Sequence, residues 1–212
     1  MRNSTNFQSD TAIYLVLSQS GSWLSKLLKY VTKANYNHIS ISLDKNMQHM
    51  YSFSRRNAYN PVWGGFMMES PFFGAMRRFR NTTGIIMRMP VSKMQYQELE
   101  NFLIQMYAEK EKYHYNISGL LLASLGIVHH AKNKYYCSEF VRDTLEKFKI
   151  VDTNYFNPIT IPEDFLQLDK IEIIYIGNLR EYAIRYAPEM LIQELLQPNI
   201  FRKMLLKLEN LL

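Results

Sequence analysis

The sequence is poor in cysteine, glycine and proline, and it has no long apolar run. Its 212 residues include one cysteine, eight glycines and seven prolines. A single cysteine excludes an intramolecular disulfide and a cysteine-rich zinc site, and it is typical of a reducing compartment. Residues 1–10 lack the apolar core of a secretory signal. The longest apolar run, residues 119–128, has about half the length of a membrane span. We therefore expect a cytoplasmic protein without a transmembrane segment.

The remaining composition is that of a folded domain with a basic surface. The chain is 47% hydrophobic and 14% aromatic, which excludes a disordered protein, and its net charge is +6. The basic residues are scattered apart from two short clusters, and no nucleic-acid-binding signature is present, so we expect no specific nucleic-acid binding. Phosphate-binding and dinucleotide-binding glycine motifs are absent from the sequence, as are histidines at metal-ligand spacing. We expect no cofactor and no metal.

Hydrophobic periodicity predicts a mixture of strands and helices. Residues 38–43 alternate strictly, with His38, Ser40 and Ser42 on one face of a strand. A turn at residues 44–46 then predicts a hairpin with residues 47–53. Residues 57–71 are rich in glycine, proline and asparagine, which predicts a loop that shapes a site. The other predicted elements are strands at 11–18, 83–90 and 170–176 and helices at 23–32, 92–112, 120–128, 137–148 and 188–212.

The single cysteine, Cys137, is placed where a helix is predicted to begin. A helix N-terminus presents unpaired N–H groups and the positive end of the helix dipole, and both favour a thiolate. His38 begins a predicted strand far upstream, and it supplies the base that a nucleophilic cysteine requires. The alternative for Cys137 is a buried structural thiol, because free cysteine is commonly a small core residue. The alternative for His38 is an imidazole that bonds only to the backbone.

Several segments resemble the circularly permuted NlpC/P60 proteins, a group of papain-like cysteine hydrolases that includes YiiX-like and lecithin retinol acyltransferase-like members. In this group the histidine strand precedes the cysteine helix, as His38 precedes Cys137. The resemblance covers about residues 11–182. The matching segments are residues 14–18, 20–22, 37–44, 50–53, 61–66, 113–120 and 136–141.

The resemblance implies an α+β domain over residues 1–182, with a small antiparallel, barrel-like sheet packed against helices. Residues 183–212 are expected to form a helical C-terminal extension. The apolar face of residues 188–212 allows oligomerisation, although the simpler expectation is that it covers the domain's own core. The resemblance also implies a bacterial source.

The resemblance further implies that Cys137 is the nucleophile and His38 the general base. The third position of the family's site is a polar residue on the strand after the histidine. The predicted hairpin places Met50 or Ser52 opposite His38, and only Ser52 is polar, so we expect Ser52 to orient the imidazole. His49 is the alternative if the register slips by one residue. The backbone N–H of Cys137 or Ser138, with the Tyr136 side chain, is expected to bind an oxyanion.

The expected activity is that of a thiol hydrolase, a cysteine peptidase or amidase that cleaves a peptide, amide or ester bond. Lipid acyl transfer on the same scaffold is the second expectation, and it rests on the family alone. A binding module with an inert cysteine is the alternative from another functional class. The sequence does not select among peptide, amide and lipid-ester substrates.

Overall fold

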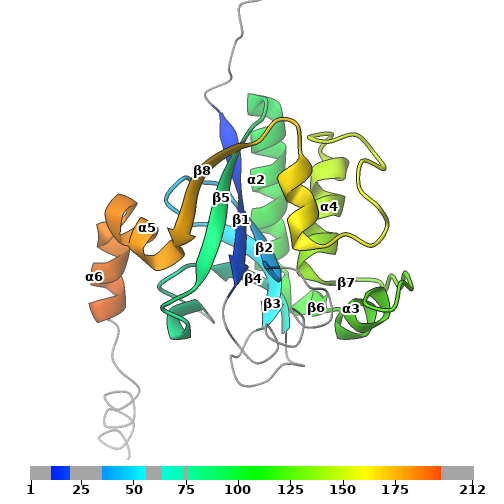
Figure 1. Ribbon diagram of the computed structural model, residues 1–212, viewed down its shortest axis with the longest axis horizontal. Helices are drawn as coiled ribbons and strands as arrows, with labels where there is room; N and C mark the ends of the chain where they lie inside the picture. Colours follow the sequence, from blue (N-terminus) through cyan, green and yellow to red (C-terminus); the bar gives the residue numbers. More distant parts are fainter. Residues whose placement is uncertain (1–10, 20–34, 56–63, 74–75, 197–212) are drawn as a thin grey trace, which may run out of the picture.

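The computed structural model describes residues 11–19, 35–55, 64–73 and 76–196, and it confirms an α+β fold (Figure 1). One sheet of eight strands has the order β7-β6-β4-β3-β2-β1-β5-β8. Neighbouring strands are antiparallel except for β6 and β7, which are parallel. The sheet is therefore larger than expected from the sequence, and it is mixed. The strands are β1 (Ala12–Gln19), β2 (His38–Ser42), β3 (Met50–Arg55), β4 (Gly64–Glu69), β5 (Thr83–Pro90), β6 (His114–Tyr115), β7 (Lys134–Tyr135) and β8 (Glu172–Asn178).

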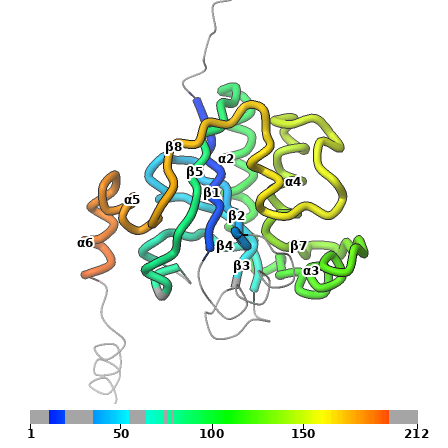
Figure 2. The backbone as a smooth tube through the Cα atoms, viewed as in Figure 1, coloured from blue at the N-terminus to red at the C-terminus, as the bar shows by residue number. Residues whose placement is uncertain are grey.

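Helices lie around this sheet, and the tube trace shows their positions along the chain (Figure 2). The α-helices are α2 (Lys93–Ala108), α3 (Ile117–Ala123), α4 (Cys137–Lys147), α5 (Leu179–Tyr186) and α6 (Pro188–Leu196). Short 3-10 helices are η1 (Met76–Arg78), η2 (Lys110–Lys112) and η3 (Pro162–Gln167). The predicted helix at residues 23–32 and residues 197–212 of the predicted helix at 188–212 lie outside the described residues.

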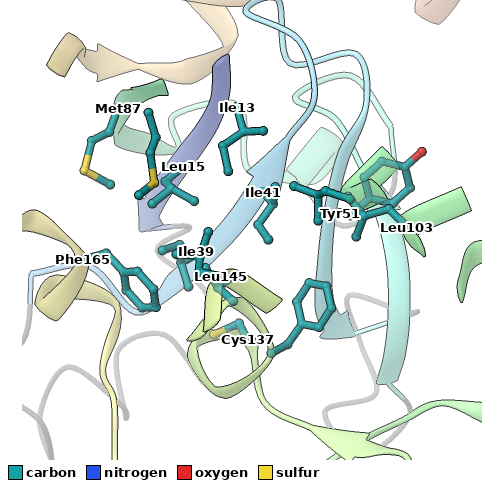
Figure 3. Packing of buried hydrophobic residues seen from close by; sticks show 14 of the residues in the cluster. Ile13, Leu15, Ile39, Ile41, Tyr51, Met87, Leu103, Cys137, Leu145 and Phe165 are labelled. Atoms are coloured by element: carbon teal, nitrogen blue, oxygen red, sulfur yellow. The ribbon is translucent and has the colours of Figure 1, made fainter. Parts of the chain in front are cut away.

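Both faces of the central strands are buried. Ile39 and Ile41 belong to a core cluster that includes Leu145 of α4 and Leu103 of α2 (Figure 3). On the opposite face, Ser40 and Ser42 are fully buried, although the alternation predicted a polar face there. A second core cluster, which covers that side of the sheet, is formed by Val16, Met47, Met50, Phe72, Met76, Ile86, Leu179, Tyr182, Ala183, Ala187 and Met190.

The start of α2 is capped and tied to the end of α4. Ser92 accepts a hydrogen bond from the Gln95 N–H, and the Gln95 side chain accepts one from the Ser92 N–H. The Gln95 amide nitrogen also donates to the carbonyls of Phe148 and Lys149, at 3.3 and 2.8 Å. These bonds satisfy carbonyls that a helix C-terminus leaves without intrahelical partners, and they hold α4 against α2.

The apolar segment at residues 120–128 is not the core helix that the sequence predicted. Helix α3 ends at Ala123, and the Ile127 N–H donates to the Leu122 carbonyl while the Gly126 N–H donates to Ala123. This bond pair is a Schellman motif, and Gly126 has the positive φ of 78° that the motif requires. The chain therefore turns before a longer helix can form.

The predicted loop at residues 57–71 contains a strand. Gly64–Glu69 forms β4 and pairs with β3, and residues 57–63 lie outside the described part of the chain. All but two of the β4 residues are buried, so the segment lacks the alternation that signals a strand in the sequence.

The C-terminal extension is packed onto the domain, and residue 182 lies inside α5. Glu194 of α6 is buried and forms ion pairs with Arg77, at 3.1 Å, and with Arg180. The Arg180 guanidinium also stacks on the Phe72 ring, 4.8 Å from its centroid. No helix in the described residues is both long and apolar enough to cross a bilayer.

Candidate active site

Cys137 is the first residue of α4, as the sequence predicted. Tyr136 precedes the helix in an extended conformation, with φ −97° and ψ 166°. Phe140, one turn into α4, packs against both Phe53 and Phe66, and both ring-centroid distances are 5.3 Å. These aromatic contacts with β3 and β4 fix the start of the helix against the sheet. The Cys137 side chain is consequently held at the edge of the core (Figure 3).

His38 begins β2, and its side chain is hydrogen-bonded to Cys137 and to Glu69. The Nε2 atom of His38 lies 2.9 Å from Oε2 of Glu69. A carboxylate only accepts hydrogen bonds, so Nε2 carries a proton and donates it to Glu69. In the neutral ring Nδ1 is then the nitrogen without a proton, and it is the one that can accept a proton.

Glu69 is the anionic partner of the histidine, a role that the sequence pattern did not predict. It is the last residue of β4, and its side chain is 9% exposed. Ser40 donates a hydrogen bond to its Oε2 at 2.7 Å, and Ser54 is a further hydrogen-bond partner. Burial opposes ionisation, but His38 and the two hydroxyls outweigh it and lower the pKa of Glu69 to about 2. Glu69 is thus ionised at neutral pH.

The His38 imidazole is held in its charged form. Burial lowers its pKa, whereas the Glu69 carboxylate and the hydrogen bonds to Cys137 and Glu69 raise it. The second set of interactions dominates, and the pKa of His38 is raised well above its ordinary value. An imidazolium beside Sγ stabilises a thiolate by direct charge attraction.

Ser52 also contacts the imidazole, with its Oγ 3.2 Å from Nε2 of His38. The structure thus brings Ser52 to the histidine, as the sequence analysis expected, but the stronger and charged contact is made by Glu69. His49 does not reach His38. Its Nδ1 instead lies 3.1 Å from Oδ2 of Asp44, and its side chain is 55% exposed.

The hairpin turn is longer than the sequence predicted, and its length fixes these positions. β3 begins at Met50, and the Leu43 N–H donates to the His49 carbonyl across the turn. Met47 is buried and has a positive φ of 59°, and the Asp44 carboxylate accepts from the Gln48 and His49 N–H groups. The return strand therefore starts later than residue 47, which keeps His49 in the turn.

A pocket opens beside Cys137, and most of its lining is apolar or aromatic. Part of its lining comes from α3, and another part comes from the segment that leads into η3. The lining residues are Tyr36, Asn37, Tyr115, Leu120, Ala123, Ser124, Tyr136, Cys137, Ser138, Ile159, Thr160, Ile161 and Pro162.

The wall at residues 158–162 is bonded directly to α4. The Ser138 hydroxyl donates to the Thr160 carbonyl at 2.6 Å, and both residues are buried. The Arg142 guanidinium donates to the Pro158 carbonyl. Glu163 in turn accepts hydrogen bonds from the backbone N–H groups at positions 35 and 36, immediately before the histidine strand. Hydrogen bonds therefore connect helix α4, this pocket wall and the segment that leads to His38.

The wall formed by α3 is anchored by Asn116, whose side chain is buried at the start of the helix. Its Oδ1 accepts from the Gly119 N–H at 2.9 Å, and its Nδ2 donates to the His129 carbonyl at 3.2 Å. A Cβ at Gly119 would lie 2.2 Å from Nδ2 of Asn116. The Asn-x-x-Gly spacing at positions 116–119 thus has a steric origin, because only glycine leaves room for the capping amide.

Tyr136 lines the pocket and immediately precedes Cys137 in the chain. Burial and the nearby Glu139 carboxylate raise the pKa of Tyr136 to about 12. The phenol therefore keeps its proton at neutral pH and remains a hydrogen-bond donor.

Searches against known protein families and against curated proteins find no match to this chain.

Proposed function

We propose that the protein is a cysteine hydrolase that cleaves an amide, peptide or ester bond, with Cys137 as nucleophile and His38 as general base. The observation that carries the proposal is the position of His38, whose imidazole is hydrogen-bonded both to the Cys137 thiol and to the buried Glu69 carboxylate. Glu69 fixes the ring and favours its charged form, which is the role of the third group in a catalytic triad. Ser40 donates a hydrogen bond to Glu69, and Ser52 is a hydrogen-bond partner of His38.

The reaction that these groups support has two steps. The Cys137 thiolate attacks the carbonyl carbon of the substrate, and the imidazolium of His38 transfers its proton to the leaving amine or alcohol as the C–N or C–O bond breaks. Water, deprotonated by His38, then attacks the thioester and releases the acid and the free thiol. In the transfer variant of the same chemistry, an acceptor alcohol or amine replaces water.

Two groups are suited to stabilise the oxyanion of the tetrahedral intermediate. The backbone N–H groups at the start of α4 are free of intrahelical carbonyl partners. The protonated Tyr136 phenol belongs to the lining of the same pocket. Donors of this kind are effective because they are already oriented before charge develops on the carbonyl oxygen.

The element order also supports a permuted papain-like fold. The histidine strand β2 and the strands β3 and β4 precede the cysteine helix α4 in the chain, and Phe140 packs that helix across β3 and β4. We propose peptide-type bonds as the first substrate class. The apolar lining contributed by Leu120, Ile159 and Ile161 favours a substrate with an apolar group next to the carbonyl, and it keeps lipid esters as the second class.

Alkylation by iodoacetamide across pH tests the site. We expect wild-type Cys137 to react readily below pH 7 and His38→Ala to react at least tenfold more slowly there, because the imidazolium no longer stabilises the thiolate. His49→Ala is the matched control and should react like the wild type, because His49 pairs with Asp44 in the turn.

Equal rates for wild type and His38→Ala would overturn the proposal and identify Cys137 as a structural thiol. Mass spectrometry with an activated ester provides a second readout, since a thioester adduct should form on wild type and be absent from Cys137→Ala.

A further inference from the structure

Four apolar residues in and just after α3 are exposed instead of buried in the core. Leu121, Leu125, Ile127 and Val128 are 57, 74, 51 and 46% exposed. Leu120 and Ala123, from the same helix, face the Cys137 pocket. This set of four exposed residues, the α3 patch, therefore borders the pocket that contains the nucleophile. Helix α3 follows β6, at the end of the sheet opposite β8 (Figure 1).

The α3 patch has a defined shape. The Schellman motif fixes Ile127 against the end of α3, and the Leu125 N–H donates to the Leu122 carbonyl. Asn116 ties the start of the helix to the His129 carbonyl, so both ends of the segment are held. The four apolar side chains are thus presented to the outside by a rigid backbone.

The chain segment that carries the α3 patch has no acidic residue. Residues 112–138 contain no aspartate or glutamate, and their lysines Lys112, Lys132 and Lys134 are exposed, of which Lys112 pairs with Glu109 at 3.0 Å. Three histidines lie in the same segment, of which His130 is paired with the buried Glu139 at 2.6 Å. A protruding apolar group with a basic border complements an anionic lipid surface, where the acyl region takes up the side chains and lysines approach the headgroups.

We propose that the α3 patch docks the protein on an anionic lipid surface. The apolar side chains enter the boundary between headgroups and acyl chains, while Lys132 and Lys134 contact lipid phosphates. Docking in this orientation places the mouth of the Cys137 pocket at the membrane surface. The interaction does not depend on the chemistry proposed for Cys137.

Flotation of the full chain with vesicles tests the docking. We expect binding to phosphatidylcholine vesicles that contain phosphatidylserine and much weaker binding to pure phosphatidylcholine. The double substitution Leu125→Ser and Ile127→Ser should reduce the partition coefficient at least about tenfold, because two large apolar side chains are lost from the interface. Lys132→Gln and Lys134→Gln should each reduce it about fivefold, and added salt should do the same.

Ile104→Ser on α2 is the matched control. Ile104 is 53% exposed, but it lies one helical turn from Glu100, and its loss should leave vesicle binding unchanged. Failure of the wild type to bind anionic vesicles would overturn the proposal, as would an equal loss of binding in Ile104→Ser. Light scattering separates a further outcome: self-association that disappears in the Leu125→Ser and Ile127→Ser variant, without vesicle binding, would assign the patch to a second copy of the chain.

Discussion

Glu69 illustrates how one buried carboxylate sets the state of a neighbouring histidine. Its charge raises the pKa of His38, and its hydrogen bond places a proton on Nε2, so that Nδ1 is the proton-accepting nitrogen of the neutral ring. Ser52 touches the same nitrogen but carries no charge. Orientation and charge are therefore supplied together by Glu69, whereas Ser52 contributes orientation alone.

Substitution of Glu69 separates these two contributions. Glu69→Gln keeps an oxygen acceptor for His38 but removes the charge, so the pKa of His38 should fall towards its ordinary value. We expect alkylation of Cys137 at neutral pH to slow by about tenfold or more, since about one pKa unit corresponds to tenfold. Ser52→Ala is the control and should change the rate by less than about threefold. A Ser52→Ala effect as large as that of Glu69→Gln would make the serine the principal orienting group.

The ion pair also makes stability depend on pH. Glu69 has a pKa of about 2 in the folded protein and 4.5 as its ordinary value. Because the folded value is the lower one, the unfolded chain binds more protons in this window, and the stabilisation is present above pH 4.5 and lost as pH falls towards 2. His38 has the opposite sign: its contribution is complete below its ordinary pKa of 6.5 and is lost as pH rises through the raised folded value.

Denaturant unfolding checks this dependence. The difference in unfolding free energy between wild type and Glu69→Gln should be largest between about pH 4.5 and 6.5. It should shrink by about 3 kcal/mol as pH falls to 2, the amount that corresponds to the shifted pKa of Glu69. A difference that stays constant across the acid range would show that the carboxylate is not ionised in the folded protein.

At the scale of elements, the start of helix α3 depends on the close contact between the Asn116 side chain and Gly119. Gly119→Ala would force the capping amide of Asn116 to move, which breaks its bonds to the Gly119 N–H and the His129 carbonyl. We expect a loss of about 1 to 3 kcal/mol in unfolding free energy. The exposed Leu121→Ala on the same helix should lose less than about 0.5 kcal/mol, and thermal denaturation of both variants compares them.

Prediction from sequence succeeded for elements whose pattern reflects their packing. The alternation at residues 38–43 predicted β2 correctly, because Ile39 and Ile41 belong to the core cluster that also contains apolar side chains of α4. The start of α4 at Cys137 was also predicted, and these two elements bring His38 and Cys137 together.

The features that the sequence did not predict also have physical explanations. Four of the six β4 residues are buried without alternation, and the strand follows a segment rich in turn-forming residues, so the sequence pattern predicted neither the strand nor the role of Glu69. The turn before β3 depends on the positive φ of Met47, which a sequence pattern does not reveal. Residues 120–128 were assigned to the core because apolar residues are usually buried, yet several of them are exposed.

At the scale of the whole molecule, the C-terminal helices belong to the folded unit. Glu194 joins α6 to Arg77 of η1 and Arg180 of α5, and Met190 lies in the second core cluster. A chain cut after residue 182 would divide α5 and remove the buried Ala183. Truncation at that point therefore tests stability as much as assembly.

Glu194→Ala is expected to loosen this connection. Removal of the buried carboxylate leaves two arginines without their shared partner, and we expect a loss of about 2 to 4 kcal/mol in unfolding free energy. Glu189→Ala on the same helix is the control, because Glu189 contacts Gln48 at an exposed position and should cost less than about 1 kcal/mol. Urea denaturation followed by circular dichroism measures both. Equal losses would mean that the buried ion pairs contribute nothing beyond a surface contact.

The chain order of the site residues has a consequence for biosynthesis. Strands β2, β3 and β4 carry His38, Ser52 and Glu69, and all of them leave the ribosome before α4. The residues of the histidine–carboxylate pair are therefore synthesised before Cys137. Translation halted before Cys137 would yield a chain with a base and no thiol, so the proposed chemistry begins only after α4 has been made and has docked across the finished hairpin.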